Sequence, residues 1–306
     1  MNKATKTAAA GRVRRYAIGG AAIDAPPIPP GLYLVATPIG NLRDITLRAL
    51  EALAAADVIA CEDTRVTRKL AEHYGIATPL TPYHEHNAAE ARPKLLARLA
   101  AGESVALVSD AGTPLVSDPG YKLVRAACEA GHAVSALPGA SSVLAALSVA
   151  ALPTDRFFFE GFLPPKEAAR RKRIVELARI PATLLLFETG PRIAEALADL
   201  AAQFGAREAA ICRELTKLHE EVRRAPLDRL AQDYAKGAET RGEFVIAIAP
   251  PSDVSETIED VDELLRQALA RVSVKDAVGE VAAATGRPRR EVYQRALALS
   301  KDNGDG

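Results

Sequence analysis

The sequence Val-Ala-Leu-Val-Ser-Asp-Ala-Gly-Thr-Pro, which occupies residues 105–114, decides the fold. Its first four residues form an apolar run typical of a buried strand, and a polar loop that contains glycine follows. A helical pattern then runs over about residues 117–130 and ends at Gly131, a residue type common just after a helix. The order strand, loop, helix predicts an α/β fold with a mainly parallel sheet.

The same order recurs three more times in the first half of the chain. Apolar runs lie at residues 32–36, 58–61 and 133–137, and polar loops follow them at residues 37–41, 62–65 and 138–142. Ligands of an open parallel sheet bind beyond the carboxyl ends of its strands. We therefore expect the four loops to gather along one edge and to form the functional site.

A break near residues 152–155 separates these repeats from a second alternating segment. We predict a disordered basic leader at residues 1–30, an N-terminal α/β domain at 31–152 and a C-terminal α/β domain at 153–251. Residues 252–306 are predicted to form an acidic linker, over residues 252–263, and a small helical tail. In the tail, Ser273 and Asp276 resemble a capping box, and Pro288 suits the first position of a basic helix. This helix pair fits nucleic-acid contact or, equally well, a helical lid with a solvated face.

Composition limits the possible partners. Lys+Arg and Asp+Glu both total 39 in 306 residues, so a nucleic acid would have to be bound by local basic patches. The three cysteines are far apart, which fits a reducing cytosol and no metal site. No apolar stretch approaches the length of a membrane span, and residues 1–30 lack the apolar region of a signal peptide.

The loops do not resemble phosphate cradles, because they contain no lysine and no glycine-rich phosphate motif. Asp63 and Asp110 near the strand ends would repel a di- or triphosphate. They suit a ligand with hydroxyl donors, an ammonium group or a sulfonium, and S-adenosylmethionine (SAM) has all three. The alternative is that each loop is an ordinary Asx or Ser/Thr turn that caps a helix.

Several motifs then resemble the RsmI family of small-subunit ribosomal RNA ribose methyltransferases, which have the tetrapyrrole-methylase fold. They include Thr-Pro-Ile-Gly-Asn-Leu-Arg-Asp at residues 37–44, Ala-Cys-Glu-Asp-Thr-Arg at 60–65, Tyr-His-Glu-His-Asn at 83–87 and Ser-Asp-Ala-Gly-Thr-Pro at 109–114. Further motifs lie at residues 117–120, 137–142, 159–164, 187–193, 213–221 and 242–245. The resemblance spans about residues 31–249 and, more loosely, the tail.

The resemblance implies methyl transfer from SAM to the ribose 2′-hydroxyl of a cytidine in 16S rRNA near the decoding centre, by a cytoplasmic homodimer. It also implies that SAM lies in a cleft between the two α/β domains. The residues expected to bind SAM are Pro38, Ile39, Gly40, Ser109, Asp110, Ala111, Gly112, Thr113, Pro138, Gly139, Ser141, Ser142 and Phe187.

A weakly acidic hydroxyl gains from a general base. The candidates are Asp63, Glu188, Glu214, Lys217 and His84, of which we select Asp63, Glu188 and Lys217 and favour Asp63. Each could instead form an ion pair, for example Asp63 with Arg65. Lys217 would need a pKa lowered by burial.

RNA contact is expected from local charge. The expected residues are Arg65, His84, Arg170, Arg171, Arg173, Arg289 and Arg290, although a charged helix face is often only solvated. We expect no metal at His84-Glu85-His86, because adjacent side chains in a loop rarely converge. Two other functions remain open: a small-molecule methylase acting on tetrapyrrole carbon, and a non-catalytic RNA-binding assembly factor.

Overall fold

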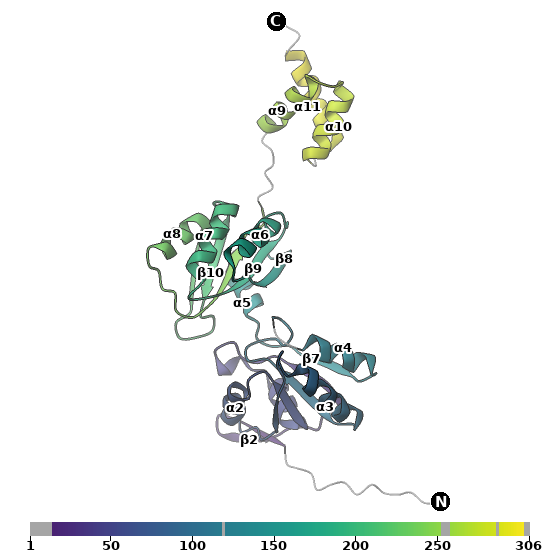
Figure 1. Cartoon of the computed structure of the whole chain (residues 1–306), viewed down its shortest axis with the longest axis vertical. Helices are drawn as coiled ribbons and strands as arrows, with labels where there is room; N and C mark the ends of the chain where they lie inside the picture. Colours follow the sequence, from purple (N-terminus) through teal and green to yellow (C-terminus); the bar gives the residue numbers. More distant parts are fainter. Residues whose placement is uncertain (1–13, 118–119, 252–257, 286–287, 303–306) are drawn as a thin grey trace, which may run out of the picture. The chain divides into compact units, whose positions relative to one another are not determined.

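The structure is a computed structural model that describes residues 14–117, 120–251, 258–285 and 288–302 (Figure 1). Contacts divide the chain into two units. The larger unit comprises residues 1–178 and 182–249. The smaller unit comprises residues 179–181 and 250–306. The larger unit contains two five-stranded sheets and a two-stranded sheet.

The first sheet is parallel throughout, as predicted. Its strands are β3 (Gly31–Val35), β4 (Val58–Cys61), β5 (Leu80–Pro82), β6 (Ser104–Val108) and β7 (Val134–Leu137), in the order β5-β4-β6-β3-β7. Because β3 lies between β6 and β7, the loops after these three strands are neighbours at one edge. This placement confirms the predicted α/β fold with a mainly parallel sheet.

Four helices connect these strands, and a fifth follows β7. They are α1 (Leu47–Ala55), α2 (Thr64–His73), α3 (Ala88–Ala100), α4 (Tyr121–Glu129) and α5 (Ser142–Val149), and a 3-10 turn, η1 (Leu42–Asp44), precedes α1. Short polar residues begin three of the helices: Thr46, Asp63 and Ser141 each accept a hydrogen bond from a backbone N–H of the first turn. The predicted helix at 117–130 begins at Tyr121, and its residues 118–119 lie outside the described part.

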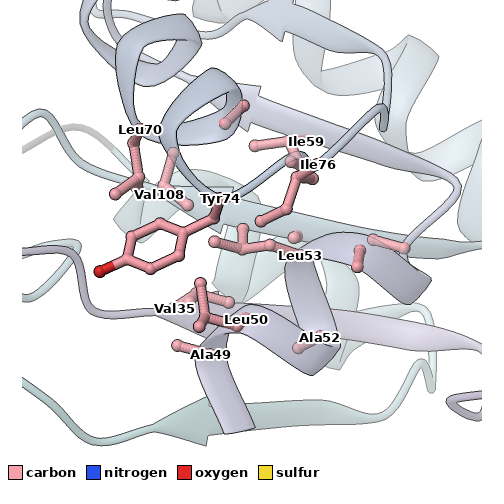
Figure 2. Packing of buried hydrophobic residues seen from close by; sticks show 14 of the residues in the cluster. Val35, Ala49, Leu50, Ala52, Leu53, Ile59, Leu70, Tyr74, Ile76 and Val108 are labelled. Atoms are coloured by element: carbon pink, nitrogen blue, oxygen red, sulfur yellow. The ribbon is translucent and has the colours of Figure 1, made fainter. Parts of the chain in front are cut away.

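The core beside α1 and α2 joins both helices to the sheet. Leu50 and Leu53 of α1 pack with Ile59 of β4 and Leu70 of α2, and the ring of Tyr74 lies among them (Figure 2). The Tyr74 hydroxyl donates to the Leu42 carbonyl at 2.7 Å, which also ties the loop after β3 to this core. Truncating one such leucine to alanine typically costs about 2–5 kcal/mol.

The predicted disordered leader is wrong for part of its length. Strands β1 (Arg15–Ile18) and β2 (Ala21–Asp24) form an antiparallel hairpin, and Tyr16 is 4% exposed in the core described above. Composition did not indicate order here, because the hairpin gains its stability from burial against distant residues. Residues 1–13, including Arg12 of the predicted basic cluster, lie outside the described part.

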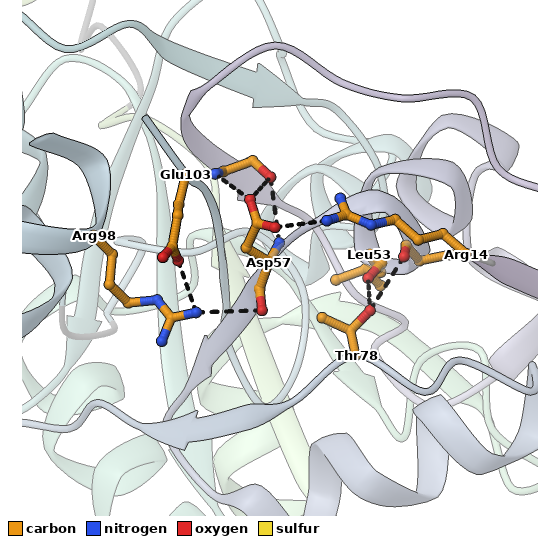
Figure 3. Close-up of polar contacts among 8 residues, drawn as sticks. Arg14, Leu53, Asp57, Thr78, Arg98 and Glu103 are labelled. Atoms are coloured by element: carbon orange, nitrogen blue, oxygen red, sulfur yellow. Dashed lines mark hydrogen bonds and ion pairs between the residues drawn. The ribbon is translucent and has the colours of Figure 1, made fainter. Parts of the chain in front are cut away.

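Arg14 also anchors the start of the hairpin to the sheet. Its guanidinium lies 2.6 Å from Asp57, whose other carboxylate oxygen accepts from the backbone N–H and the hydroxyl of Ser104 (Figure 3). Burial raises the pKa of Asp57, but the hydrogen bonds from Ser104 and Arg14 outweigh it and hold that pKa below its ordinary value. The carboxylate therefore stays ionised and joins three separate segments.

The second sheet is mixed. Its order is β11 (Glu221–Pro226), β10 (Glu208–Arg213), β12 (Glu243–Ile248), β9 (Thr183–Thr189), β8 (Phe157–Phe162), and only β8 and β9 pair in parallel. Helices α6 (Glu167–Leu177), α7 (Ile193–Phe204) and α8 (Leu227–Ala235) accompany it. The sequence does not predict β11, because its adjacent residues Arg223 and Arg224 are charged and pair with β10 rather than forming an apolar run.

The smaller unit contains three helices. They are α9 (Ile258–Leu269), α10 (Val274–Thr285) and α11 (Arg289–Asp302), whose apolar faces share one buried cluster that includes Leu265, Val278 and Val292. The Ser273 hydroxyl accepts from the backbone N–H of Asp276 at 3.3 Å and donates to its carboxylate, which confirms the predicted cap of α10. The predicted linker is wrong for residues 258–263, which belong to α9, and residues 252–257 lie outside the described part.

Candidate functional site

A cavity of about 290 Å³, here the first cavity, lies where loops of the first sheet face β9 and β12 of the second. It is lined by Ile39, Asp110, Ala111, Gly112, Thr113, Val116, Ser117, Ser141, Ser142, Val143, Phe162, Phe187, Glu188, Thr189, Leu215, Glu243, Phe244 and Val245. Eight of the residues predicted to bind SAM are among them: Ile39, Asp110, Ala111, Gly112, Thr113, Ser141, Ser142 and Phe187.

The loops that form the first cavity are joined by hydrogen bonds. Thr37 and Gly112 exchange two backbone hydrogen bonds of 2.9 and 3.0 Å, and the Thr37 hydroxyl donates to the Ser109 carbonyl. The Thr113 hydroxyl donates to the Ala140 carbonyl of the loop at residues 138–142, at a distance of 3.2 Å. The site therefore presents a prearranged backbone to a ligand, which reduces the entropy lost on binding.

Pro138 and Gly139 are not among the described residues that line the first cavity. Gly139 instead permits close packing, since a Cβ there would lie 2.9 Å from the Cβ of Ala36. Gly139 therefore lets the loop at residues 138–142, which contains Ser141 and Ser142, pack against the residue that follows β3. The direct contact of Pro138 and Gly139 with SAM stays a prediction.

An aromatic cluster forms one wall of the first cavity. The rings of Phe159 and Phe162 lie edge-on to Phe187, with centroid distances of 4.8 and 5.6 Å. The family motifs at residues 159–164 and 187–193 contain both Phe162 and Phe187, but only Phe187 was expected to bind SAM. The parallel register of β8 and β9 pairs these two residues, and that register depends on contacts that residue spacing does not reveal.

Glu188 is 2% exposed and brings a negative charge to the first cavity. Its Oε1 accepts from the Thr189 backbone N–H at 2.8 Å, whereas its Oε2 has no hydrogen bond and lies 3.3 Å from Arg192. Burial raises the pKa of Glu188 despite that hydrogen bond and the nearby arginine charges. An under-compensated buried carboxylate favours a cationic ligand.

Asp110 borders two cavities at once. It lines the first cavity and also a second cavity of about 270 Å³. Burial, and then the charge of Asp63, raise the pKa of Asp110, although the Asp63 backbone N–H donates to its Oδ1 at 3.0 Å. A carboxylate with a raised pKa is a better proton acceptor than an ordinary one.

Asp63 lies elsewhere. Its side chain caps α2 and forms an ion pair of 2.6 Å with Arg65, the alternative weighed above. Hydrogen bonds from Arg65 lower the pKa of Asp63 to about 2. Within the described part, Asp63 is absent from the lining of both cavities, and its low pKa makes it a weak base.

The second cavity is lined by Thr37, Pro38, Ile39, Gly40, Leu42, Val66, Thr67, Lys69, Leu70, Ser109, Asp110, Ala111, Lys217 and Glu243. The predicted SAM-binding residues Pro38, Gly40 and Ser109 therefore lie here and not in the first cavity. Gly40 permits Lys217 to cross the loop after β3, because a Cβ at Gly40 would lie 2.4 Å from Cγ of Lys217. Ala at this position would displace the lysine.

The ammonium of Lys217 lies 2.7 Å from Glu214 and 2.8 Å from Glu243. Burial alone would lower the pKa of Lys217, but its hydrogen bonds to the two carboxylates outweigh that effect and raise it. The lysine is thus held protonated, which is the opposite of what a basic role requires.

The predicted RNA-binding arginines of α6 are neutralised. Arg170 is 4% exposed and lies 2.7 Å from Asp199, which contradicts an RNA-binding role for Arg170. Arg171 pairs with Asp199 and Glu167, and Arg173 pairs with Glu160 and Glu176. Spacing along α6 could not reveal Asp199 of α7 or Glu160 of β8, whereas Glu167 and Glu176 lie on α6 itself.

The remaining predicted RNA-binding residues have different surroundings. Arg65 is exposed but pairs with Asp63, and His84 is half-buried with its Nδ1 lacking a hydrogen bond. Arg289 and Arg290 are exposed on α11. Among the described residues, no group of three or more histidine, cysteine or carboxylate side chains could hold a metal ion, and no helix has the length and hydropathy to cross a membrane.

The chain is similar in sequence to known proteins. A family model described as Tetrapyrrole (Corrin/Porphyrin) Methylases matches residues 31–231, and one described as RsmI C-terminal HTH domain matches residues 255–300. The chain is 51% identical to Ribosomal RNA small subunit methyltransferase I of Mesorhizobium japonicum over 290 residues, which are 94% of this chain and 99% of that protein. It is 47% identical to the protein of the same name from Xylella fastidiosa over 271 residues, 87% of this chain and 98% of that one.

A solved structure has a similar fold. Uroporphyrin-III C-methyl transferase from Thermus thermophilus, complexed with S-adenyl homocysteine, superposes with a TM-score of 0.51 at 23% identity. The match covers 71% of this chain and 96% of that chain.

Proposed function

Because the chain belongs to the ribosomal RNA small subunit methyltransferase I family, we propose that it methylates the ribose 2′-hydroxyl of a cytidine in 16S rRNA near the decoding centre. SAM is the methyl donor. The observation that carries the proposal is the first cavity, whose joined loops and buried Glu188 suit a cofactor with neutral hydrogen-bonding groups and a positive charge. We also propose a homodimer, which the resemblance supports, and a cytoplasmic location, which the widely spaced cysteines fit.

When bound, SAM supplies a methyl group already activated by a sulfonium. The methyl carbon–sulfur bond breaks, a bond from that carbon to the ribose oxygen forms, and the hydroxyl proton must leave. The chain therefore has to align the two ligands and accept one proton.

We assign the proton acceptor to Asp110. The methyl group of SAM and the ribose hydroxyl of the RNA must lie next to each other for the transfer. Asp110 borders both cavities and can therefore lie beside both groups. Its raised pKa supports this assignment over Asp63 with its pKa of about 2, and over the protonated Lys217. Glu188 lines only the first cavity, which supports a role in holding the cofactor's positive charge.

The function is tested with labelled SAM and small ribosomal subunits from a strain that lacks the enzyme. Label at a cytidine 2′-oxygen of 16S rRNA is the expected result. In a parallel assay with a tetrapyrrole in place of the subunits, label in the tetrapyrrole would favour the small-molecule methylase, and no binding of SAM at all would favour an assembly factor.

Glu188→Gln is expected to weaken SAM binding by about tenfold or more, since a charge-assisted hydrogen bond contributes about 1.5–3 kcal/mol. Isothermal titration calorimetry measures the affinity.

The ligand-free Glu188→Gln variant is also expected to melt at a higher temperature than the wild-type protein at neutral pH. A raised carboxyl pKa means that the folded state loses stability as the pH rises through the shifted pKa. The exposed substitution Glu90→Gln is the control. An unchanged affinity of Glu188→Gln for SAM would contradict the role assigned to Glu188.

Joint replacement of Arg289 and Arg290 by alanine is expected to flatten the salt dependence of RNA binding. Each lost phosphate contact lowers the slope of log K against log salt by about 0.7–0.9. Filter binding at several salt concentrations measures the slope. Arg173→Ala is the matched control, because its guanidinium already pairs with Glu160 and Glu176. Equal slopes in all three proteins would place the RNA contact outside α11.

A further inference from the structure

We propose that the second cavity binds the acceptor nucleoside of the RNA, with its ribose directed toward the first cavity. This inference rests on the proposed function and specifies where its second substrate binds. The target nucleotide would leave its neighbours in the strand and enter the cavity, as bases of single-stranded RNA do when they are read individually.

The position of the second cavity carries the first part of the argument. Ile39, Asp110, Ala111 and Glu243 line both cavities, so the two spaces share a wall. A nucleoside in the second cavity therefore lies next to a cofactor in the first. Asp110 in the shared wall is then within reach of the ribose hydroxyl, as the transfer requires.

The lining suits a nucleoside rather than a phosphate chain. Leu42, Val66 and Leu70 supply apolar surface for the face of a base, and Thr37, Thr67 and Ser109 supply polar groups. The charged residues balance, since Asp110 and Glu243 oppose Lys69 and Lys217. A neutral nucleoside fits that balance, and its two flanking phosphates would remain outside.

Lys217 provides a directed hydrogen-bond donor. An ammonium has three N–H groups, of which one donates to Glu214 and one to Glu243. The third remains for an acceptor in the cavity, and a pyrimidine carbonyl oxygen is such an acceptor. The adjacent Glu243 carboxylate can accept from a base amino or imino group.

The backbone that holds Lys217 is strained. Glu214 and Thr216 have φ values of 50° and 66°, in the left-handed region that non-glycine residues rarely adopt. Such strain persists where the surrounding structure imposes it, and it concentrates at ligand sites. Here it sets the direction of the lysine across Gly40 into the second cavity.

The test blocks the second cavity without touching the first. Val66 lies on α2, lines only the second cavity and is 40% exposed, so Val66→Trp adds bulk at a tolerant position. We expect kcat/KM for small subunits to fall at least tenfold while the Kd for SAM changes less than twofold. Val175→Trp is the matched control, at a 50% exposed helix position remote from both linings.

Each outcome decides the proposal. Wild-type kcat/KM in Val66→Trp overturns the nucleoside site, and a parallel loss of SAM affinity assigns the second cavity to the cofactor. If wild-type protein does not label RNA, the proposed function itself fails. This result differs from the failure of one variant.

Photo-crosslinking on the wild-type protein avoids any folding defect of a variant. The probe is a short oligoribonucleotide with 5-iodocytidine at the methylated position, irradiated with S-adenosylhomocysteine present. We expect crosslinked peptides that contain residues 37–42 or 66–70. Crosslinks confined to other segments would overturn the nucleoside site even if methylation of RNA is normal.

Discussion

Replacing Asp110 by asparagine is expected to lower kcat by about 10²–10⁴-fold, the usual contribution of a positioned proton acceptor. Asparagine keeps the shape of the side chain and one of its oxygens, and saturating SAM removes any effect of a changed Kd for SAM. Initial rates of labelled methyl transfer at saturating SAM and small subunits measure kcat. The loss arises because the amide cannot take the proton of the attacking hydroxyl.

The pH profile sharpens this expectation. Burial and the Asp63 charge raise the pKa of Asp110, so wild-type kcat should begin to fall at a higher pH than an ordinary aspartate would give. Asp110→Asn should lose this acid limb. Asp63→Asn is the control: asparagine still caps α2, and kcat should be nearly normal with the acid limb shifted to lower pH. A wild-type kcat in Asp110→Asn, or an equal loss in Asp63→Asn, would refute the assignment.

Asp199→Ala is expected to lower the free energy of unfolding by about 3–5 kcal/mol, because it leaves the buried Arg170 guanidinium without its main partner. Urea unfolding of the wild-type and variant proteins measures the difference. Glu195→Ala is the matched control. Glu195 is 73% exposed and 3.5 Å from the same arginine, so its loss should cost only about 0–1 kcal/mol.

The pH dependence of this ion pair has a definite sign. Burial raises the pKa of Asp199, but hydrogen bonds from Arg171 and Arg170 outweigh it and lower the pKa below the ordinary aspartate value. The contribution is therefore present above that ordinary value and is lost as the pH falls toward the lowered one. Equal costs for the two variants, or a difference that does not shrink in acid, would contradict this account.

Local patterns were sufficient for the first sheet. Strands β3, β4, β6 and β7 are short apolar runs bounded by loop residues, and the caps at Thr46 and Ser141 involve residues only a few positions apart. The edge where the loops meet then follows from the topology of a parallel sheet. Most of the predicted SAM-binding residues therefore line one or the other cavity.

Long-range pairing was not predictable in the same way. The charge run of α6 looked like an RNA-binding surface because its partners Glu160 and Asp199 are distant in sequence. For Asp63 the sequence left a base and an ion pair with Arg65 as alternatives, because spacing alone does not show whether Arg65 and the α2 backbone donate to its oxygens. The division into two cavities likewise depends on Lys217, which reaches the Gly40 loop from the second sheet.

The wall that the two cavities share has a thermodynamic consequence. Ile39, Asp110, Ala111 and Glu243 line both cavities, so any shift of these residues on binding in one cavity would change the lining of the other. By linkage the effect is reciprocal, and any factor by which the cofactor tightens RNA binding is the factor by which RNA tightens cofactor binding. S-adenosylhomocysteine and the methylated RNA would then change each other's affinity by the same factor. The release of the two products would therefore be coupled through the four residues that line both cavities.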